Sequence, residues 1–291
     1  MASTTVAIPT RVLVMGMTRH DGTVASAELL PVAEACGQSP EQVRSCLRRL
    51  VGEGLFVREG TGRTSMYAAT EAGMAALGQV TERQRLAYVQ DAAGRGWDRT
   101  WRVVAFAIPE ARRAARDAFR DRLIDLGGAS IHNGLYVSAH RWEKDVLGEA
   151  SRLGVAGHVT VAATVDLDVG GVDDPRELTR LLWPIEELAD RYRRFVEHYR
   201  DVPLALTEMR TRRERLPDAA FLPGALAMGV AFQACFDTDP LLPPELLPRP
   251  WPGREARELV VRSRRLALLI REAHDRPALF RSFDDLLESI P

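Results

Sequence analysis

The fold of this chain is decided by residues 39–67, which read SPEQVRSCLRRLVGEGLFVREGTGRTSMY. The stretch opens with a helix-start signal, because Ser39 suits the N-cap, Pro40 the first helical position and Gln42 the reciprocal partner three residues after the cap. Apolar residues then recur at the spacing of one buried helix face, namely Val43, Cys46, Leu47 and Leu50. The pattern predicts a helix that buries this face and points its arginine and amide side chains outward.

A hairpin is predicted directly after this helix. Gly52 and Gly54 end the helix, and two short apolar runs follow at residues 55–57 and 65–68, with a basic tip at residues 59–63 between them. A helix that exposes arginines and leads into a basic hairpin is typical of a winged helix, in which the helix enters the major groove and the hairpin lies along the backbone or minor groove. Five arginines against three glutamates give the stretch a charge of only +2. Periodicity alone therefore also allows a solvated structural unit.

Two shorter helices are expected before this stretch and one longer helix after it. Apolar residues at 12–17 predict the first helix. The second covers part of residues 26–36, where Pro31 must either begin the helix or kink it. Residues 71–89 read as a long helix that closes an N-terminal winged helix-turn-helix domain, which we expect over residues 1–90.

The composition is that of an ordinary globular protein, and 291 residues are enough for two or three domains. A net charge of −1 gives no general attraction to nucleic acid or membrane, so any nucleic-acid surface must be local, as in residues 39–67. Lys144 is the only lysine in the chain. Arginine suits bidentate contacts to phosphate and guanine, although a genome-wide codon bias explains the same fact.

The cysteines offer neither a disulfide framework nor metal-ligand spacing, because Cys36, Cys46 and Cys235 are scattered. The N-terminus lacks the charged-then-apolar order of a signal peptide. The longest apolar run, residues 225–236, is too short to span a bilayer. We therefore expect a cytoplasmic protein without a membrane partner, a metal or a cofactor.

Residues 100–168 predict a second domain of alternating strands and helices. Asn133-Gly134 is a strong two-residue hairpin signal, and residues 158–167 alternate strictly, which places Val159, Val161, Ala163, Val165 and Leu167 on one face. The expected elements are a strand at 101–109, a helix at 110–126, strands at 129–132 and 135–139, a helix at 142–153 and a strand at 158–167. The order βαββαβ is that of a ferredoxin-like fold.

Residues 172–291 read as an all-helical C-terminal domain, so the fold class of the whole chain is α+β. A helix opens at residues 173–175 and can run to Tyr199. Six prolines between Pro240 and Pro252 require an extended path that packs over the protein. Further helices are expected at residues 204–215, 223–236 and 253–273.

Four passages are distinctive and occur in order along the chain. They are EQVRSCLRRLVGEGLFVREGTGRTSMY at residues 41–67, WRVVAFAIPE at 101–110 with the arginine-rich helix after it, IHNGLYVS at 131–138, and DPLLPPELLPRPWPGREAR at 239–257. The last is the most specific, since prolines and tryptophan at this spacing rarely recur by chance. Together the passages resemble the phenylacetate-catabolism repressors of the PaaX type over nearly the whole chain.

The resemblance implies a homodimeric transcriptional repressor with a winged helix, a ferredoxin-like middle domain and a helical C-terminal domain. On this resemblance we expect residues 172–291 to bind the effector and to dimerise. In some members an aryl-CoA thioester, phenylacetyl-CoA, releases the repressor from DNA. The chain departs from the family pattern in the helix at residues 225–236, which carries no charge, and this puts that ligand in question. We expect a double-stranded operator of an aromatic-acid or related catabolic operon as the target, a small acid or its acyl-CoA thioester as effector, and no enzymatic activity.

The DNA-contacting residues follow from the resemblance, position by position. Those on the exposed side of the recognition helix are Gln42, Arg44, Ser45, Arg48 and Arg49, and those on the wing are Arg58, Arg63 and Thr64. Arg44 and Ser45 are expected to read bases, because the first half of such a helix goes deepest into the groove. Arg63→Ala should weaken binding to all sequences, whereas Arg44→Ala should relax specificity. No catalytic, metal-binding or effector-binding residue is assigned.

A metal-dependent ferredoxin-like nuclease, or a nucleic-acid-binding relic of one, is the alternative function. Glu110 follows the first strand of the middle domain and could bind Mg²⁺, but no second carboxylate is evident beside it. Three other sets of residues each have a functional and a structural interpretation. A stripe of arginines could bind an anion or form a solvated helix face, and three histidines could bind a metal or be neighbours by coincidence. Four aromatic residues could line an effector pocket or belong to the core. These sets are Arg112, Arg113, Arg116 and Arg120; His132, His140 and His158; and Trp183, Tyr192, Phe195 and Tyr199.

Overall fold

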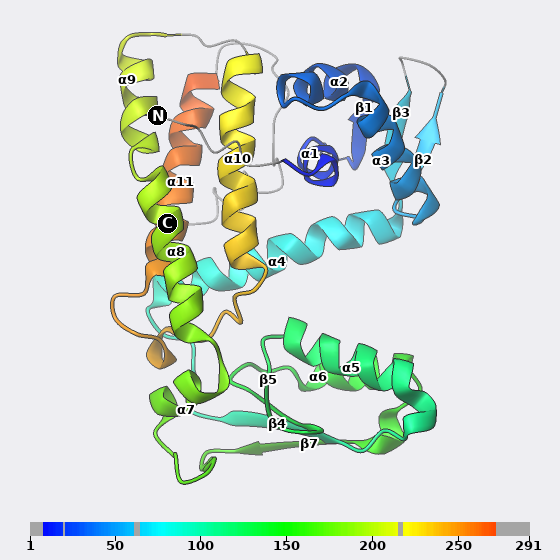
Figure 1. The fold of residues 1–291 in the computed structure, drawn as a ribbon, viewed down its shortest axis with the longest axis vertical. Helices are drawn as coiled ribbons and strands as arrows, with labels where there is room; N and C mark the ends of the chain where they lie inside the picture. The colour runs from blue at the N-terminus through cyan, green and yellow to red at the C-terminus, as the bar shows by residue number, and fades with distance from the viewer. Residues whose placement is uncertain (1–7, 20, 61–64, 215–217, 272–291) are drawn as a thin grey trace. The chain divides into compact units, whose positions relative to one another are not determined.

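The computed structural model describes residues 8–19, 21–60, 65–214 and 218–271 of the chain (Figure 1). The residues form two compact units, of which the first combines residues 1–89, 193–234 and 254–291 and the second combines residues 90–192 and 235–253. The segment expected to form the middle domain lies within the second unit, whereas the C-terminal segment contributes to both. The division into three domains stays a prediction.

The first unit begins with a winged helix-turn-helix, which confirms the fold expected from residues 39–67. Its elements are α1 (Thr10–Gly16), β1 (Thr23–Ala25), α2 (Ser26–Ala35), α3 (Pro40–Gly52), β2 (Phe56–Glu59), β3 (Met66–Ala69) and α4 (Glu71–Ala93). The strands form an antiparallel sheet in the order β1-β3-β2. The sequence does not predict β1, because a strand of three residues is too short to show an alternation.

The α2 helix runs from Ser26 to Ala35 and passes through Pro31. It therefore begins before the proline, and the alternative in which the helix begins at Pro31 is wrong. Pro31 is tolerated because it is exposed and its missing N–H removes the bond to a single carbonyl. Gly37, with φ of +73°, ends the helix as predicted.

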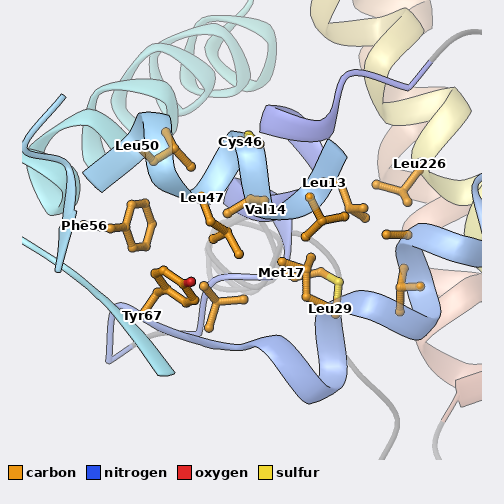
Figure 2. Packing of buried hydrophobic residues seen from close by; sticks show 14 of the residues in the cluster. Leu13, Val14, Met17, Leu29, Cys46, Leu47, Leu50, Phe56, Tyr67 and Leu226 are labelled. Carbon is orange, nitrogen blue, oxygen red and sulfur yellow. The ribbon is translucent and has the colours of Figure 1, made fainter. Parts of the chain in front are cut away.

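One hydrophobic core fills the winged helix (Figure 2). The four residues of the predicted apolar face are all buried in it, at Val43, Cys46, Leu47 and Leu50. They share the core with side chains from α1, β1, α2, β2 and β3, including Leu13, Leu29, Phe56 and Tyr67. Burial raises the pKa of the Cys46 thiol, so Cys46 acts in this core as a small apolar side chain.

The second unit contains the predicted ferredoxin-like sheet. Its strands and helices are β4 (Trp101–Phe106), α5 (Arg113–Asp125), β5 (Ala129–His132), β6 (Leu135–Ser138), α6 (Glu143–Arg152) and β7 (Val159–Thr164). The strand order is β5-β6-β4-β7 with every pair antiparallel, which is the arrangement of two interleaved βαβ units. Figure 1 shows α5 and α6 on the same side of this sheet.

The structure agrees with the sequence prediction at the hairpin of the sheet and differs from it at the last strand. At the hairpin, Gly134 has φ of +77° and a Cβ there would lie 2.5 Å from the carbonyl oxygen of Phe106, so glycine is required as predicted. At the last strand, β7 ends at Thr164 and Val165 is 68% exposed. The prediction that the strand continues to residue 167 is wrong, because the N–H of Asp166 donates to Thr164 Oγ1 and turns the chain away from the ladder.

The remaining helices are α7 (Pro175–Leu182), α8 (Ile185–Tyr199), α9 (Val202–Thr211), α10 (Asp218–Phe236) and α11 (Pro252–Arg271). The expectation of one helix from residue 175 to Tyr199 is wrong. Pro184 forces the residue before it, Trp183, into extended backbone at φ −119° and ψ 147°. The indole N–H of Trp183 then donates to the carbonyl of Gly127 at 3.1 Å. The predicted end of the last helix, beyond Arg271, lies outside the described residues.

The proline-rich segment packs over the protein as predicted, on the sheet of the second unit, but its extended path is interrupted by a 3-10 turn at Pro244–Leu246. Leu242, Leu246 and Leu247 are buried in one cluster with Trp101 and Trp183, and Leu241 is buried as well. The carboxylate of Asp239 accepts from Tyr192 Oη at 2.7 Å and from the N–H of Leu241 at 2.8 Å. Within the described part of the chain, no helix combines the length and the apolar character that a membrane crossing needs.

Candidate nucleic-acid interface

The start of α3 is fixed by a complete capping box. The N–H of Gln42 donates to Ser39 Oγ at 3.2 Å, and the N–H of Ser39 donates to Gln42 Oε1 at 2.7 Å. Pro40 occupies the first turn, where its missing N–H has no intrahelical partner to lose. The helix that the sequence assigns to DNA recognition therefore has a defined first residue and a defined rotation.

The side of α3 opposite the core is exposed at each of the five predicted positions, Gln42, Arg44, Ser45, Arg48 and Arg49. Because an α-helix repeats every ~3.6 residues, Ser45 and Arg48 lie opposite the buried face. Arg44 and Arg49 flank them on either side. Three guanidinium groups and one hydroxyl thus share a surface that the core holds in place.

The arginines on this surface form few ion pairs with other described residues. Arg44 Nη1 lies 2.9 Å from Glu41 Oε1, and both side chains are largely exposed. An exposed pair three residues apart on a helix contributes only about 0.2–0.5 kcal/mol, so Arg44 can exchange Glu41 for a phosphate or a guanine. Arg48 and Arg49 form no ion pair with another described residue.

The wing places Arg58 beside the recognition helix but gives it a structural contact. Arg58 lies on β2 opposite Tyr67 of β3. Its Nε and Nη2 donate to Ser65 Oγ at 3.2 Å and 2.9 Å, and Ser65 is 1% exposed. Two donors of the guanidinium thus hold the residue before β3, on the tip side of the hairpin, which leaves Nη1 for a further contact. The other two predicted wing residues, Arg63 and Thr64, lie outside the described residues.

Two contacts that sequence reasoning missed fix the surroundings of α3. Arg11 of α1 pairs with Glu53, the residue after α3, at 2.6 Å. The N–H of Ser26, at the start of α2, donates to the carbonyl of Ser65 at 3.0 Å and ties α2 to the wing. No local pattern reveals such contacts, since the partners lie 42 or 39 residues apart.

Three of the four arginines of the stripe in the middle segment form local ion pairs, whereas Arg112 Nη1 donates to the carbonyl of Gly154. Arg116 Nη1 lies 2.5 Å from Glu110 Oε2, and Arg120 pairs with Asp121 at 3.0 Å. Arg113 contacts Glu110 and Asp117 at 3.9 Å and 3.6 Å. Glu110 itself belongs to the 3-10 turn that precedes α5. These contacts match a solvated helix face and a turn residue better than an anion cradle or a Mg²⁺ ligand.

The histidines and aromatic residues also have structural surroundings. His140 Nε2 lies 2.9 Å from the carbonyl of Pro240, and no cluster of three metal-ligating side chains occurs among the described residues. Trp183, Tyr192, Phe195 and Tyr199 are all buried. Phe195 packs against Tyr199 and against Phe232 of α10 with ring centroids 4.9 Å and 5.7 Å apart. The predicted residues that the structure brings together as one exposed surface are those of α3.

This arrangement defines a winged helix-turn-helix protein with an attached ferredoxin-like sheet and additional helices. Three family models match successive parts of the chain: "PaaX-like protein" at residues 10–73, "PaaX protein central Cas2-like domain" at residues 94–178 and "PaaX-like protein C-terminal domain" at residues 183–274. The chain belongs to the PaaX family.

A curated relative agrees with this assignment, and a solved structure shares the fold. The transcriptional repressor PaaX of Escherichia coli (strain K12) is 26% identical over 246 residues, which cover 84% of this chain and 74% of the relative. The structure of an uncharacterized protein from Mycobacterium tuberculosis aligns with a TM-score of 0.54 over 90% of this chain and 96% of that one. With 21% sequence identity, this second likeness shows the fold alone.

Proposed function

We propose that this protein is a DNA-binding transcriptional repressor that reads its operator with α3. The observation that carries the proposal is the surface of α3, where a capped helix fixed to the core exposes Arg44, Ser45, Arg48 and Arg49 next to an antiparallel wing. Winged helices use such a surface in the major groove. The curated relative is named a transcriptional repressor, which fits the same function.

The two halves of the surface have different roles in this proposal. Arg44 and Ser45 lie in the first half of α3 and read base edges, with Arg44 leaving Glu41 to do so. Arg48 and Arg49 lie further along and neutralise phosphates. Arg58 and Arg63 of the wing contact the backbone or the minor groove. Removal of a phosphate contact lowers the salt dependence of binding, whereas removal of a base contact relaxes the sequence preference.

A second copy of the chain supplies the affinity that one winged helix lacks. Residues 39–67 carry a charge of only +2, which is small for a protein that binds DNA through phosphates. A homodimer bound to a pseudo-palindromic operator doubles the contacts, with half-sites one or more helical turns of about 10 bp apart. A repressor works where its operator lies, so the proposed location is the cytoplasm.

The occupancy of the operator is set by a small organic acid, free or as its acyl-CoA thioester. The target is an aromatic-acid or related catabolic operon. An effector can shift the protein off DNA only if it binds the two forms of the dimer with different affinity. A thermal-shift screen of free aryl acids against their CoA thioesters, with and without operator DNA, tests this part. Equal stabilisation by every compound in both conditions contradicts it.

The central test selects DNA fragments from the organism's own genome with the full-length protein and maps the bound sites by footprinting. We expect inverted repeats, and an affinity for the selected site that falls by about 1–3 kcal/mol in Arg44→Ala. Arg254→Ala is the matched control, because Arg254 is an exposed arginine on α11 paired with Glu258. The proposal fails if no sequence is enriched, or if Arg44→Ala and Arg48→Ala both bind as tightly as the control.

A further inference from the structure

The core of the winged helix contains two side chains from the C-terminal segment. Leu222 and Leu226 of α10 are 4% and 0% exposed, and they belong to the same cluster as Leu13, Leu29 and Leu47. Phe221 and Ala225 pack against that cluster as well. Figure 2 shows Leu226 at the Leu13 end of the cluster, away from Phe56 and Tyr67. The DNA-reading part of the chain is therefore completed by a helix that follows it by more than a hundred residues.

The composition of α10 explains why it packs on more than one side. No charged residue occurs between residues 219 and 236, and a helix that is apolar all round is buried on several faces. Its first half contributes Leu222 and Leu226 to the winged helix. Further along, Phe232 is 3% exposed and packs against Phe195 of α8. α10 thus connects the core beneath the recognition helix with the helical part of the first unit.

The position of α3 depends on the same core. Leu13 of α1, Leu29 of α2 and Leu47 of α3 all lie in the cluster, and each is 2% exposed or less. Protein interiors are close-packed, so the loss or displacement of one large side chain shifts its neighbours. In addition, Arg11 of α1 pairs with Glu53 at the end of α3. A movement of α1 is therefore passed to both the buried face and the end of the recognition helix.

From this packing we infer that Leu222 and Leu226 are positioning residues for DNA recognition. They hold α1 and α2 from outside the winged helix and thereby set the position of α3, although neither reaches DNA. The inference rests on the proposed function and adds a route for its regulation, since a ligand that displaces α10 alters the surface that reads the operator. Such a ligand acts only through a difference in its affinity for the two positions of α10.

The test uses the full-length protein with Leu226→Ala, Leu226→Met and Leu204→Ala. Leu204 of α9 is 61% exposed, so its variant controls for the loss of a leucine without loss of core. Methionine conserves the volume of leucine and should rescue the function. Leu222→Val is the milder substitution if Leu226→Ala does not fold. Two readouts are needed: amide hydrogen exchange in α1 and α2, and the ratio of affinities for the genome-selected site and for a scrambled duplex of equal length.

For Leu226→Ala we expect exchange in α1 and α2 to rise about tenfold relative to the Leu204→Ala control. We also expect the affinity ratio to fall about tenfold, with Leu226→Met close to wild type. A smaller folded fraction changes the amount of active protein but leaves this ratio unchanged, so the ratio separates positioning from mere destabilisation. Unchanged exchange, or a preserved ratio in spite of faster exchange, overturns the inference. If the wild-type protein selects no site, the proposed function fails, and the exchange readout still decides whether α10 holds α1 and α2.

Discussion

Ser39 and Gln42 hold each other at the first turn of α3 through two reciprocal hydrogen bonds, 3.2 Å and 2.7 Å long. Gln42 is also exposed on the side of the helix that we assign to DNA. Its amide oxygen accepts the N–H of Ser39, which leaves the amide nitrogen for another partner. A bidentate contact of Gln42 to adenine would need both atoms. If Gln42 contacts DNA, its NH₂ group is the part that the capping box leaves fully free, while its oxygen already accepts one hydrogen bond.

Gln42→Glu separates the structural role of this residue from its role in binding. Glutamate is an equally good capping-box partner, and its charge is favourable at a helix N-terminus. We expect the free energy of unfolding, measured by urea denaturation, to stay within about 0.5 kcal/mol of wild type or to rise. The affinity for the selected DNA should fall about tenfold, because the new carboxylate faces phosphates.

Ser39→Ala is the complementary variant for the same site. It removes the cap without adding charge, so it should lower the free energy of unfolding by about 1 kcal/mol while the folded protein binds DNA nearly as wild type does. Fluorescence anisotropy with a labelled duplex measures the affinity of both variants. A loss of affinity in Ser39→Ala as large as that in Gln42→Glu would contradict this expectation, because it would show that the cap itself contributes to DNA binding.

Glu41→Gln should strengthen DNA binding. Glu41 holds Arg44 at 2.9 Å in the free protein and brings a negative charge to the proposed interface. Its removal frees Arg44 and should raise the affinity roughly threefold to tenfold, at a cost to folding stability of about 0.5 kcal/mol or less. Glu258→Gln is the control, because Glu258 forms a comparable exposed pair with Arg254 on α11. If both variants bind DNA alike, α3 is not the surface that faces phosphate.

The local features of α3 and the wing could be predicted because the relevant signals lie within a few residues of one another. The cap at Ser39, the buried face ending at Leu50, and the hairpin were all readable from spacing and glycine positions. The break at Trp183 was missed, although Pro184 disfavours a continuous helix and is a local signal for it. The end of β7 was not readable, because the alternation continues past Thr164 while the turn at Asp166 decides where the strand stops.

The contacts that position the candidate site could not be predicted, because they join distant parts of the chain. The hydrophobic pattern shows that Leu222 and Leu226 are buried but does not say in which core. The pairing of Arg11 with Glu53 depends on how α1 packs beside α3. Arg102 lies in an apolar strand and is 6% exposed. The neighbouring residues in the sequence do not indicate that its charge is buried.

Asp98→Asn should destabilise the second unit in a pH-dependent way. Asp98 binds Arg102 through both carboxylate oxygens, at 2.6 Å and 2.5 Å, and Arg141 at 3.2 Å. The hydrogen bonds from Arg102 hold the pKa of Asp98 well below its ordinary value. A carboxyl whose pKa is lowered by folding stabilises the protein above its unfolded pKa of about 4, and this stabilisation is lost as the pH falls below that value.

The expected loss in Asp98→Asn at pH 7 is roughly 1–3 kcal/mol, since the variant leaves the buried guanidinium of Arg102 with Glu143 at 3.4 Å as its remaining ion-pair partner among the described residues. The difference from wild type should shrink as the pH is lowered from about 4. Urea denaturation followed at a series of pH values measures it, with Asp173→Asn, at an exposed loop position, as control. A difference that is independent of pH would exclude the ionised carboxylate as its source.

Gly73 and Gly78 of α4 offer a matched pair of substitutions with opposite expected effects. A Cβ at Gly73 would lie 2.1 Å from the carbonyl oxygen of Leu55, at the base of the wing, whereas nothing lies within 4 Å of a Cβ at Gly78. Alanine favours a helix by about 0.5–1 kcal/mol over glycine, so Gly78→Ala should stabilise the protein by that amount. At Gly73 the clash with backbone outweighs this gain, and Gly73→Ala should destabilise by roughly 1–3 kcal/mol.

The same pair tests the wing as part of the DNA-binding surface. The N–H of Thr70 donates to the carbonyl of Leu55 at 2.9 Å, and Thr70 Oγ1 donates to the carbonyl of Gly54 at 2.6 Å. An alanine at Gly73 pushes α4 away from this junction and so moves the wing relative to α3. Gly73→Ala should therefore weaken binding to the selected duplex, while Gly78→Ala should bind as wild type does, both measured by anisotropy at a temperature where each variant is folded. Wild-type affinity in a folded Gly73→Ala variant would show that the position of the wing does not contribute to DNA recognition.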